Sequence, residues 1–402
     1  MRIWWSKTIT VKFSHGKGEK NLRKRRKRLL SVILLALMCF IFVSNNVDIL
    51  QETEYVTVEM ESRMSEPAAT DAGMEQMIYR QTTSIYTYSM LQEDIITLCT
   101  QYPDIVKFSV LGQSVEGRDI YQLTLGNPNA PHAVFIQAGI HAREYMTTQL
   151  VMRMLTEYAM RYAMQNALQY QTGTYQEIPY QSAFEQTCFY IIPMSNPDGV
   201  AISQFGEAAI SNPERLAFIR AAYERDKKSY KSYAQYLACW KANANGVDLN
   251  RNFNAGWEGI HQRTMPSSEL YKGAMPESEP ETQILISAAK QRTFDCIISY
   301  HARGEVVYYD AAGNAPEMSL RSATLANIAS GLNGYKMMNC KTTSNVVLGG
   351  FGDWTMLTLG IPSITIEIGK GTCPLPQSEF ESIWNSNKEM WERIACHFQG
   401  YI

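Results

Sequence analysis

The sequence has no Cys-x-x-Cys pair, although eight cysteines are spread along its 402 residues. The absence of this motif excludes zinc ribbons and the dithiol motifs of redox proteins. Disulfide pairing cannot be derived from scattered cysteines. Cys296 lies in an apolar run, so we expect it to be a small core residue. Internal repeats and low-complexity tracts are absent too, which excludes solenoids and other repeat folds.

Basic residues are scarce outside the N-terminal arm. Residues 1–28 hold 11 Lys and Arg and one Glu, which leaves 26 basic and 38 acidic residues in the rest of the chain. That acidic excess gives no nucleic-acid footprint, so we expect no nucleic-acid partner. A chain that is 45% hydrophobic and 19% charged is expected to be globular with a sizeable core.

The basic arm runs directly into fifteen uncharged residues, 29–43. A membrane anchor needs about 17–25 apolar residues, so this run is short for one. A cleaved signal peptide matches the basic-then-apolar order. However, no convincing small-x-small cleavage site follows Val43, and the long basic region favours retention with that end in the cytoplasm.

These features predict a cell-membrane protein with a single span and an extracytoplasmic catalytic domain, with secretion as the alternative. The predicted parts are a basic cytoplasmic arm (1–28), a transmembrane anchor or signal sequence (29–45), a linker (46–78) and a folded domain (79–402).

Strand-like apolar runs alternate with helical patterns throughout the folded part. This alternation predicts one α/β domain with a largely parallel sheet. The expected strands are 106–111, 121–125, 133–136, 189–193, 295–300 and 363–368, and the expected helices are 89–99, 146–166, 212–240 and 377–398.

Only six histidines occur, and two of them, His141 and His301, stand at the ends of expected buried strands. A single His in such a place is more often a core residue. Here Glu144 follows His141 by three residues, so both side chains can point at one ion. Zinc hydrolases commonly use three protein ligands and leave the fourth position to water. Two imidazoles and one carboxylate, without thiolates, favour a catalytic zinc site with one Zn²⁺ per chain.

Two further stretches carry chemistry. In residues 247–253, Asp248 can accept the free N–H of a ligating His, Arg251 offers a planar fork for a carboxylate, and Asn250 is a further donor. Glu367 ends an apolar strand, where a carboxylate is costly unless it is paired or functional. Beside an activated water it would be a general base.

The order and content of these motifs resemble the zinc metallocarboxypeptidases of the carboxypeptidase A type. The resemblance implies a three-layer α/β/α domain around a mixed sheet, zinc on His141, Glu144 and His301, and Glu367 as the base. It also implies that Arg143, Asn250 and Arg251 bind substrate. The matching motifs lie at 139–144, 196–199, 246–253, 278–282, 299–301 and 365–367.

The sequence departs from the family in two places. Lys241 follows Trp240 where members often have an Arg that stabilises the oxyanion, so a point charge replaces a fork. Lys241 can still serve the oxyanion. In addition, no Tyr occurs in residues 344–352, where digestive members have a Tyr that closes over the substrate.

Three stretches look more like the bacterial branch of the family: the residues after Trp240, Gly304-Glu305 and the segment 365–369. That branch cuts γ-D-glutamyl–diamino acid bonds in peptidoglycan stem peptides. We therefore expect a zinc peptidase acting on such wall peptides. The alternatives are a carboxypeptidase for ordinary peptides, a deacylase of small N-acyl amino acids, and an inactive wall-peptide-binding module.

Overall fold

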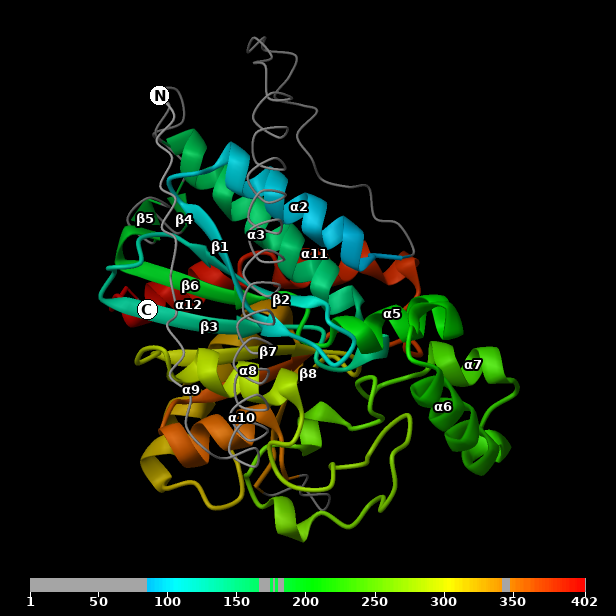
Figure 1. Ribbon diagram of the computed structural model, residues 1–402. Coiled ribbons are helices and arrows are strands. Elements are labelled where there is room, and N and C mark those ends of the chain that lie inside the picture. Colours follow the sequence, from blue (N-terminus) through cyan, green and yellow to red (C-terminus); the bar gives the residue numbers. More distant parts are fainter. Residues whose placement is uncertain (1–84, 166–173, 176–177, 180–183, 342–347, 402) are drawn as a thin grey trace, which may run out of the picture. The chain divides into compact units, whose positions relative to one another are not determined.

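A computed structural model describes residues 85–165, 174–175, 178–179, 184–341 and 348–401 (Figure 1). All of them belong to one compact unit, Tyr79–Ile402. The expected cytoplasmic arm, anchor and linker lie outside the described residues. Within the described part of the chain, no helix is both long and apolar enough to cross a membrane.

The centre of the domain is an eight-stranded mixed sheet with the order β1-β2-β6-β3-β7-β10-β8-β9. The four central strands β6, β3, β7 and β10 run parallel to one another. β2 pairs antiparallel with both β1 and β6, β8 pairs antiparallel with β10, and the edge strand β9 pairs parallel with β8. The strands are β1 (Val106–Gln113), β2 (Asp119–Leu125), β3 (His132–Gln137), β6 (Thr187–Ile192), β7 (Cys296–His301), β8 (Val306–Tyr309), β9 (Lys336–Asn339) and β10 (Ser363–Glu367); a separate two-stranded ribbon joins β4 (Thr174–Tyr175) to β5 (Ile178–Pro179).

Helices cover both faces of this sheet, as Figure 1 shows for α2, α3 and α11 on one side and α8 and α10 on the other. Strands buried on both faces read as continuous apolar runs, and β6 and β7 are buried at every residue for this reason. The helices are α2 (Tyr88–Gln101), α3 (Met146–Gln165), α5 (Pro197–Phe205), α6 (Pro213–Asp226), α7 (Tyr233–Ala238), α8 (Pro280–Lys290), α9 (Pro316–Asn333), α10 (Phe351–Trp354), α11 (Phe380–Asn387) and α12 (Met390–Phe398).

Alternate residues of the central strands point to opposite faces of the sheet and contribute to a separate aromatic cluster on each face. Phe135 of β3 makes an edge-to-face contact with Phe294 and a tilted contact with Phe351, on the α8 and α10 side. On the opposite side, Phe189 of β6 packs on Trp391 of α12. The sequence prediction of an α/β domain is therefore confirmed, with the sheet mixed because β2, β8 and β9 run opposite to the other strands.

The six expected strands are confirmed, with ends within two residues of those predicted. The single helix expected over 212–240 is wrong, because Ser232 caps a new helix, α7, by accepting from Gln235 N. The closing helix expected over 377–398 is also divided. Tyr158 of α3 donates to the Lys388 carbonyl at 2.5 Å, at the break between α11 and α12.

The buried carboxyl of Glu392, in α12, makes the stability of the fold depend on pH. Its carboxyl is completely buried and accepts a hydrogen bond from Arg161 Nη1 at 3.3 Å. Burial raises its pKa from the usual 4.5 to about 8, although Arg161 acts in the opposite direction. Because the folded chain then holds a proton that the unfolded chain has lost, the free energy of unfolding should fall as pH rises through this range.

We expect Glu392→Gln to remove that loss. We measure the free energy of unfolding of both proteins by denaturant titration. The difference, variant minus wild type, should increase by on the order of 3 kcal/mol from pH 5 to pH 9. Glu381→Gln, which changes an exposed Glu paired with Arg153, is the matched control. Parallel stability profiles for wild type and Glu392→Gln would contradict the assignment.

Candidate metal centre and active site

The site begins where β3 ends. Gly139 has φ +64°, and a Cβ there would meet Thr148 Oγ1 at 2.9 Å, so glycine is needed for the turn. His141 then precedes a short 3₁₀ turn, Ala142–Glu144, that leads into α3. This turn places an imidazole and a carboxylate, three residues apart, at the carboxyl edge of the central strands, where α/β proteins bind ligands.

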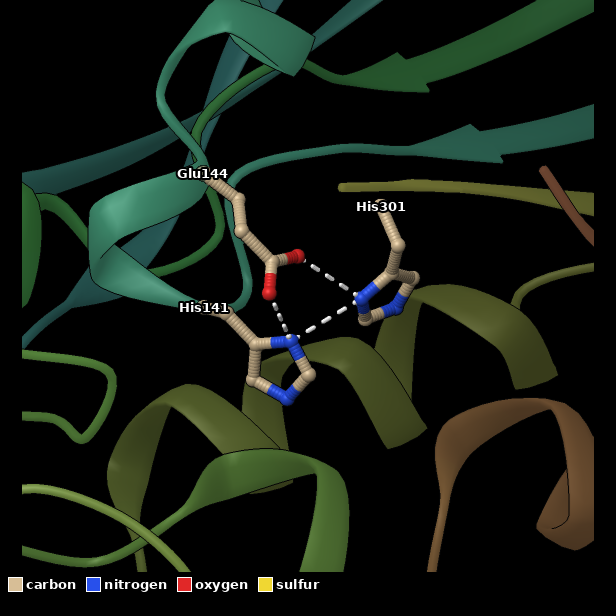
Figure 2. A group of neighbouring side chains, drawn as sticks. All are labelled: His141, Glu144 and His301. Atoms are coloured by element: carbon tan, nitrogen blue, oxygen red, sulfur yellow. Dashed lines mark hydrogen bonds and ion pairs between the residues drawn. The ribbon is translucent and has the colours of Figure 1, made fainter. Parts of the chain in front are cut away.

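Three side chains converge at this edge (Figure 2). Nδ1 of His141 lies 3.0 Å from Glu144 Oε1, and Nδ1 of His301 lies 3.0 Å from Glu144 Oε2. The two Nδ1 atoms are 2.9 Å apart. All three residues are buried. The structure thus brings together the three residues predicted as metal ligands, one pair from the β3–α3 turn and one residue from the end of β7.

The donor set fits zinc. Two imidazole nitrogens and a carboxylate oxygen face one another within the 4.8 Å that a single ion can span, and these are ligands that Zn²⁺ prefers. Although burial alone would raise the pKa of Glu144, the two imidazoles keep it well below its usual value. The carboxylate is therefore ionised, as a metal ligand must be.

Asp248 lies directly behind the metal centre. Its Oδ1 is 3.3 Å from Nε2 of His141, the ring nitrogen that does not face Glu144. Its Oδ2 accepts from the backbone N–H of Leu270 at 3.1 Å and lies 3.9 Å from Lys241 Nζ. Burial opposes ionisation, but the charges of Lys241 and His141 lower the pKa of Asp248 well below its usual range. A carboxylate in this place fixes the ring of a ligating His.

The pairing of β10 with β7 places Glu367 beside the metal centre. In the parallel pairing of β10 with β7, Glu367 lies opposite His301, so both side chains end at the same edge of the sheet. Burial raises the pKa of Glu367 to about 7, partly offset by His301. A bound cation would lower it again, because positive charge favours the carboxylate.

Glu367 also lines a cavity of about 590 Å³ that opens beside His141 and His301, within the range of small-ligand pockets. We call this cavity the Arg251 pocket. Its walls combine polar groups, including Asp353, whose pKa burial raises to about 7, with Met338 and Met356. The residues that line it are His141, Lys241, Asn250, Arg251, His301, Tyr308, Tyr309, Asp310, Met338, Cys340, Gly350, Gly352, Asp353, Met356, Ser363, Thr365 and Glu367.

Arg251 is the main cation of that pocket. Its Nη1 donates to its neighbour's carbonyl, Asn250 O, at 2.7 Å, and its Nε lies 3.4 Å from Gln262 Oε1. No carboxylate in the described part of the chain lies within ion-pair distance of it. Asn250 accepts from Phe351 N through its amide oxygen, which orients the side chain. The pocket therefore holds a buried guanidinium available to a substrate carboxylate.

Arg143 differs from the other two residues predicted to bind substrate, because it is not among the residues that line the Arg251 pocket. Its Nη2 lies 3.2 Å from Glu269 Oε2, and its Nη1 donates to Cys239 O at 3.2 Å. Glu269 was not foreseen, since no local signal marks it. Tyr308 was also missed, but the register of β8 opposite Thr365 of β10 explains its place in the pocket.

The expectation that no lid tyrosine precedes Asp353 concerns a segment of which residues 342–347 lie outside the described residues. The sequence left the pairing of the eight cysteines open. The seven that fall in the described ranges are all free thiols, and Cys296 is buried as predicted.

Comparison with known proteins agrees with this geometry. The family model described as zinc carboxypeptidase, of peptidase family M14, matches residues 91–390. The gamma-D-glutamyl-L-diamino acid endopeptidase 1 of Lysinibacillus sphaericus is 31% identical over 301 residues, which cover 74% of this chain and 69% of that protein. Carboxypeptidase B of Rattus norvegicus is 28% identical over 231 residues, covering 56% of this chain and 47% of the rat protein.

Solved structures share the fold at lower identity. Thrombin activatable fibrinolysis inhibitor superposes with a TM-score of 0.61 at 20% identity, covering 83% of this chain and 77% of the other. Carboxypeptidase A of Helicoverpa armigera gives 0.56 at 19% identity, covering 86% and 80%. The chain therefore belongs to the zinc carboxypeptidase family and is a metallopeptidase that uses Zn²⁺.

Proposed function

We propose that this enzyme hydrolyses the γ-D-glutamyl–diamino acid amide bond of peptidoglycan stem peptides. The observation that supports the proposal is that His141 and His301 of the metal cluster line one pocket together with Glu367 and Arg251, and that Arg251 has no carboxylate partner among the described residues. The acyl specificity rests on the relative from Lysinibacillus sphaericus, whose name states this bond type.

In this proposal His141, Glu144 and His301 hold one zinc ion, and Asp248 keeps the ring of His141 in place. Zinc bound there would polarise the scissile carbonyl and lower the pKa of a water molecule. Glu367 accepts a proton from the attacking water on its carboxylate and passes it to the leaving amine nitrogen. The register of β10 against β7 places Glu367 beside His301, and both residues line the Arg251 pocket.

The remaining pocket residues bind and orient the substrate. Arg251 pairs with a carboxylate of the diamino acid, and Asn250 adds a hydrogen-bond donor. Lys241 lines the pocket on the side of His141, and its side chain is 14% exposed. A fixed cation there stabilises the negative charge that develops on the carbonyl oxygen.

A second candidate substrate is the C-terminus of an ordinary peptide. The guanidinium of Arg251 would bind an α-carboxylate as well as a diamino acid carboxylate, and carboxypeptidases B are among the relatives. The two substrates differ in the acyl half, which is γ-linked in the wall peptide and α-linked in the ordinary one.

The metal ligands are testable directly. We expect about one Zn²⁺ per wild-type chain by elemental analysis, and loss of most of it in His301→Ala and in Glu144→Ala, because each removes one of three ligands. His132→Ala, which changes a half-buried His near Asp295, is the matched control and should keep its zinc. Full metal content in either ligand variant would mean that other residues hold the ion.

Glu367→Gln tests the chemistry together with the substrate. Wild type should release the diamino acid from L-Ala-γ-D-Glu-diaminopimelate faster than a C-terminal residue from an α-linked peptide, with products identified by mass. The variant keeps the shape but lacks the base, so its turnover should fall by ~10²–10⁴-fold with zinc and substrate binding retained. Turnover within about tenfold of wild type at normal metal content would exclude Glu367 as the base.

The cellular location is a separate proposal. The basic block before Leu29 and the missing cleavage site support an anchor that holds the catalytic domain outside the membrane. We expect the full-length chain in the membrane fraction, accessible to protease added to intact cells. A released protein that begins near residue 45 by N-terminal sequencing would instead support secretion.

A further inference from the structure

Arg143 and Glu269 form an ion pair beside the metal centre that the proposed mechanism does not use. Arg143 precedes the ligand Glu144, and its guanidinium contacts Glu269 Oε2 and the Cys239 carbonyl, each at 3.2 Å. Its Nε is buried and has no acceptor among the described residues. Both side chains remain about one quarter exposed, at 23% and 25%. A ligand can therefore reach both charges.

The position of Glu269 is fixed by the site itself. The carbonyl of the preceding residue, Ser268, accepts from the backbone N–H groups of Lys241 and Ala242, both at 2.9 Å. The following residue, Leu270, donates its N–H to the Asp248 carboxylate. The segment that carries Glu269 is thus bonded on both sides to residues around the metal centre, so its carboxylate is held at Arg143 by the same framework.

The location of the pair matches the acyl half of a substrate. The Arg251 pocket receives the amine half, and Arg143 lies outside that pocket but next to a metal ligand. In a γ-glutamyl amide the acyl residue keeps a free α-carboxylate close to the scissile bond. In an α-linked peptide that carboxyl group is itself part of the bond. An arginine fork binds such a carboxylate through two parallel hydrogen bonds.

We propose, on the basis of the proposed function, that Glu269 is a specificity residue. It occupies Arg143 until the free α-carboxylate of a γ-linked acyl residue takes its place. Partly exposed ion pairs contribute little free energy, so the exchange is easily made by a second carboxylate. A neutral acyl group cannot make it, and the guanidinium then stays with Glu269.

The test uses two peptides with the same scissile bond. One is L-Ala-γ-D-Glu-diaminopimelate, and the other carries a carboxamide in place of the α-carboxylate of D-Glu. We expect the full-length wild-type enzyme to prefer the carboxylate by about 10- to 100-fold in kcat/KM. In Arg143→Gln the ratio of the two kcat/KM values should fall to about one, because the guanidinium that binds the carboxylate is removed.

Glu269→Gln separates competition from simple structural support. Removing the competing charge should lower KM for the carboxylate peptide by about 3- to 10-fold with kcat unchanged, and leave KM for the carboxamide peptide unchanged. Glu224→Gln, which changes an exposed Glu paired with Lys227 on another surface, is the matched control. Calorimetric binding of both peptides to Glu367→Gln, with and without Glu269→Gln, should show the same changes without turnover.

The outcomes distinguish the two proposals. If wild type cleaves both peptides equally well, the role of Arg143 and Glu269 is wrong while the proposed function stands. If Glu269→Gln weakens binding of the carboxylate peptide, Glu269 supports Arg143 and does not compete for it, which also overturns the inference. If wild type cleaves neither peptide but cleaves α-linked peptides, the proposed function fails and the inference fails with it.

Discussion

The site depends on one buried interaction, the carboxylate of Glu144 between two imidazoles. Its two oxygens contact His141 and His301 separately, and Ala302 N donates to one of them at 3.1 Å. A buried carboxylate is costly unless positive charge and donors surround it. Here the metal ligands themselves satisfy it. The same three groups would hold the Zn²⁺ that the family uses.

A second group of buried acids fixes the segment that carries Lys241 and Asp248. The side-chain amide of Asn243 donates to Glu279 at 2.8 Å and to Glu281 at 3.0 Å, while Glu281 also accepts from Val115 N. Burial raises the pKa of Glu281 to about 7. The Ser278–Thr282 motif thus acts at a distance from the metal, by holding the residues that orient His141 and line the Arg251 pocket.

The two arginines near the metal centre differ in whether they have a carboxylate partner. Arg251 is buried and lacks a carboxylate partner among the described residues, whereas Arg143 is paired with Glu269. An unpaired buried guanidinium is prepared to bind an anion, and a paired one requires exchange. Two arginines of the same chemical type therefore place different demands on the two halves of a substrate, although the sequence gives them the same appearance.

The sequence by itself determined the features that depend on local pattern. The apolar runs gave the six central and edge strands, and the spacing of His141 and Glu144 with His301 gave the metal ligands, because strand ends and short turns fix where such side chains point. The helix breaks at Ser232 and Lys388 were both missed. The break at Lys388 coincides with a tertiary contact, from Tyr158 to the Lys388 carbonyl, that does not appear in a local window, whereas Ser232 caps α7 through a local bond from Gln235 N. The short strands β8 and β9, of four residues each, were also missed.

Only the tertiary structure decided which distant residues meet. The register of β10 against β7 places Glu367 beside His301, and the register of β8 brings Tyr308 into the Arg251 pocket. Arg143 and Arg251 received one role from the sequence, but packing separated them and paired Arg143 with Glu269, 126 positions further along the chain. Such pairings depend on long-range backbone hydrogen bonds and on burial, and neither leaves a periodic signal in the sequence.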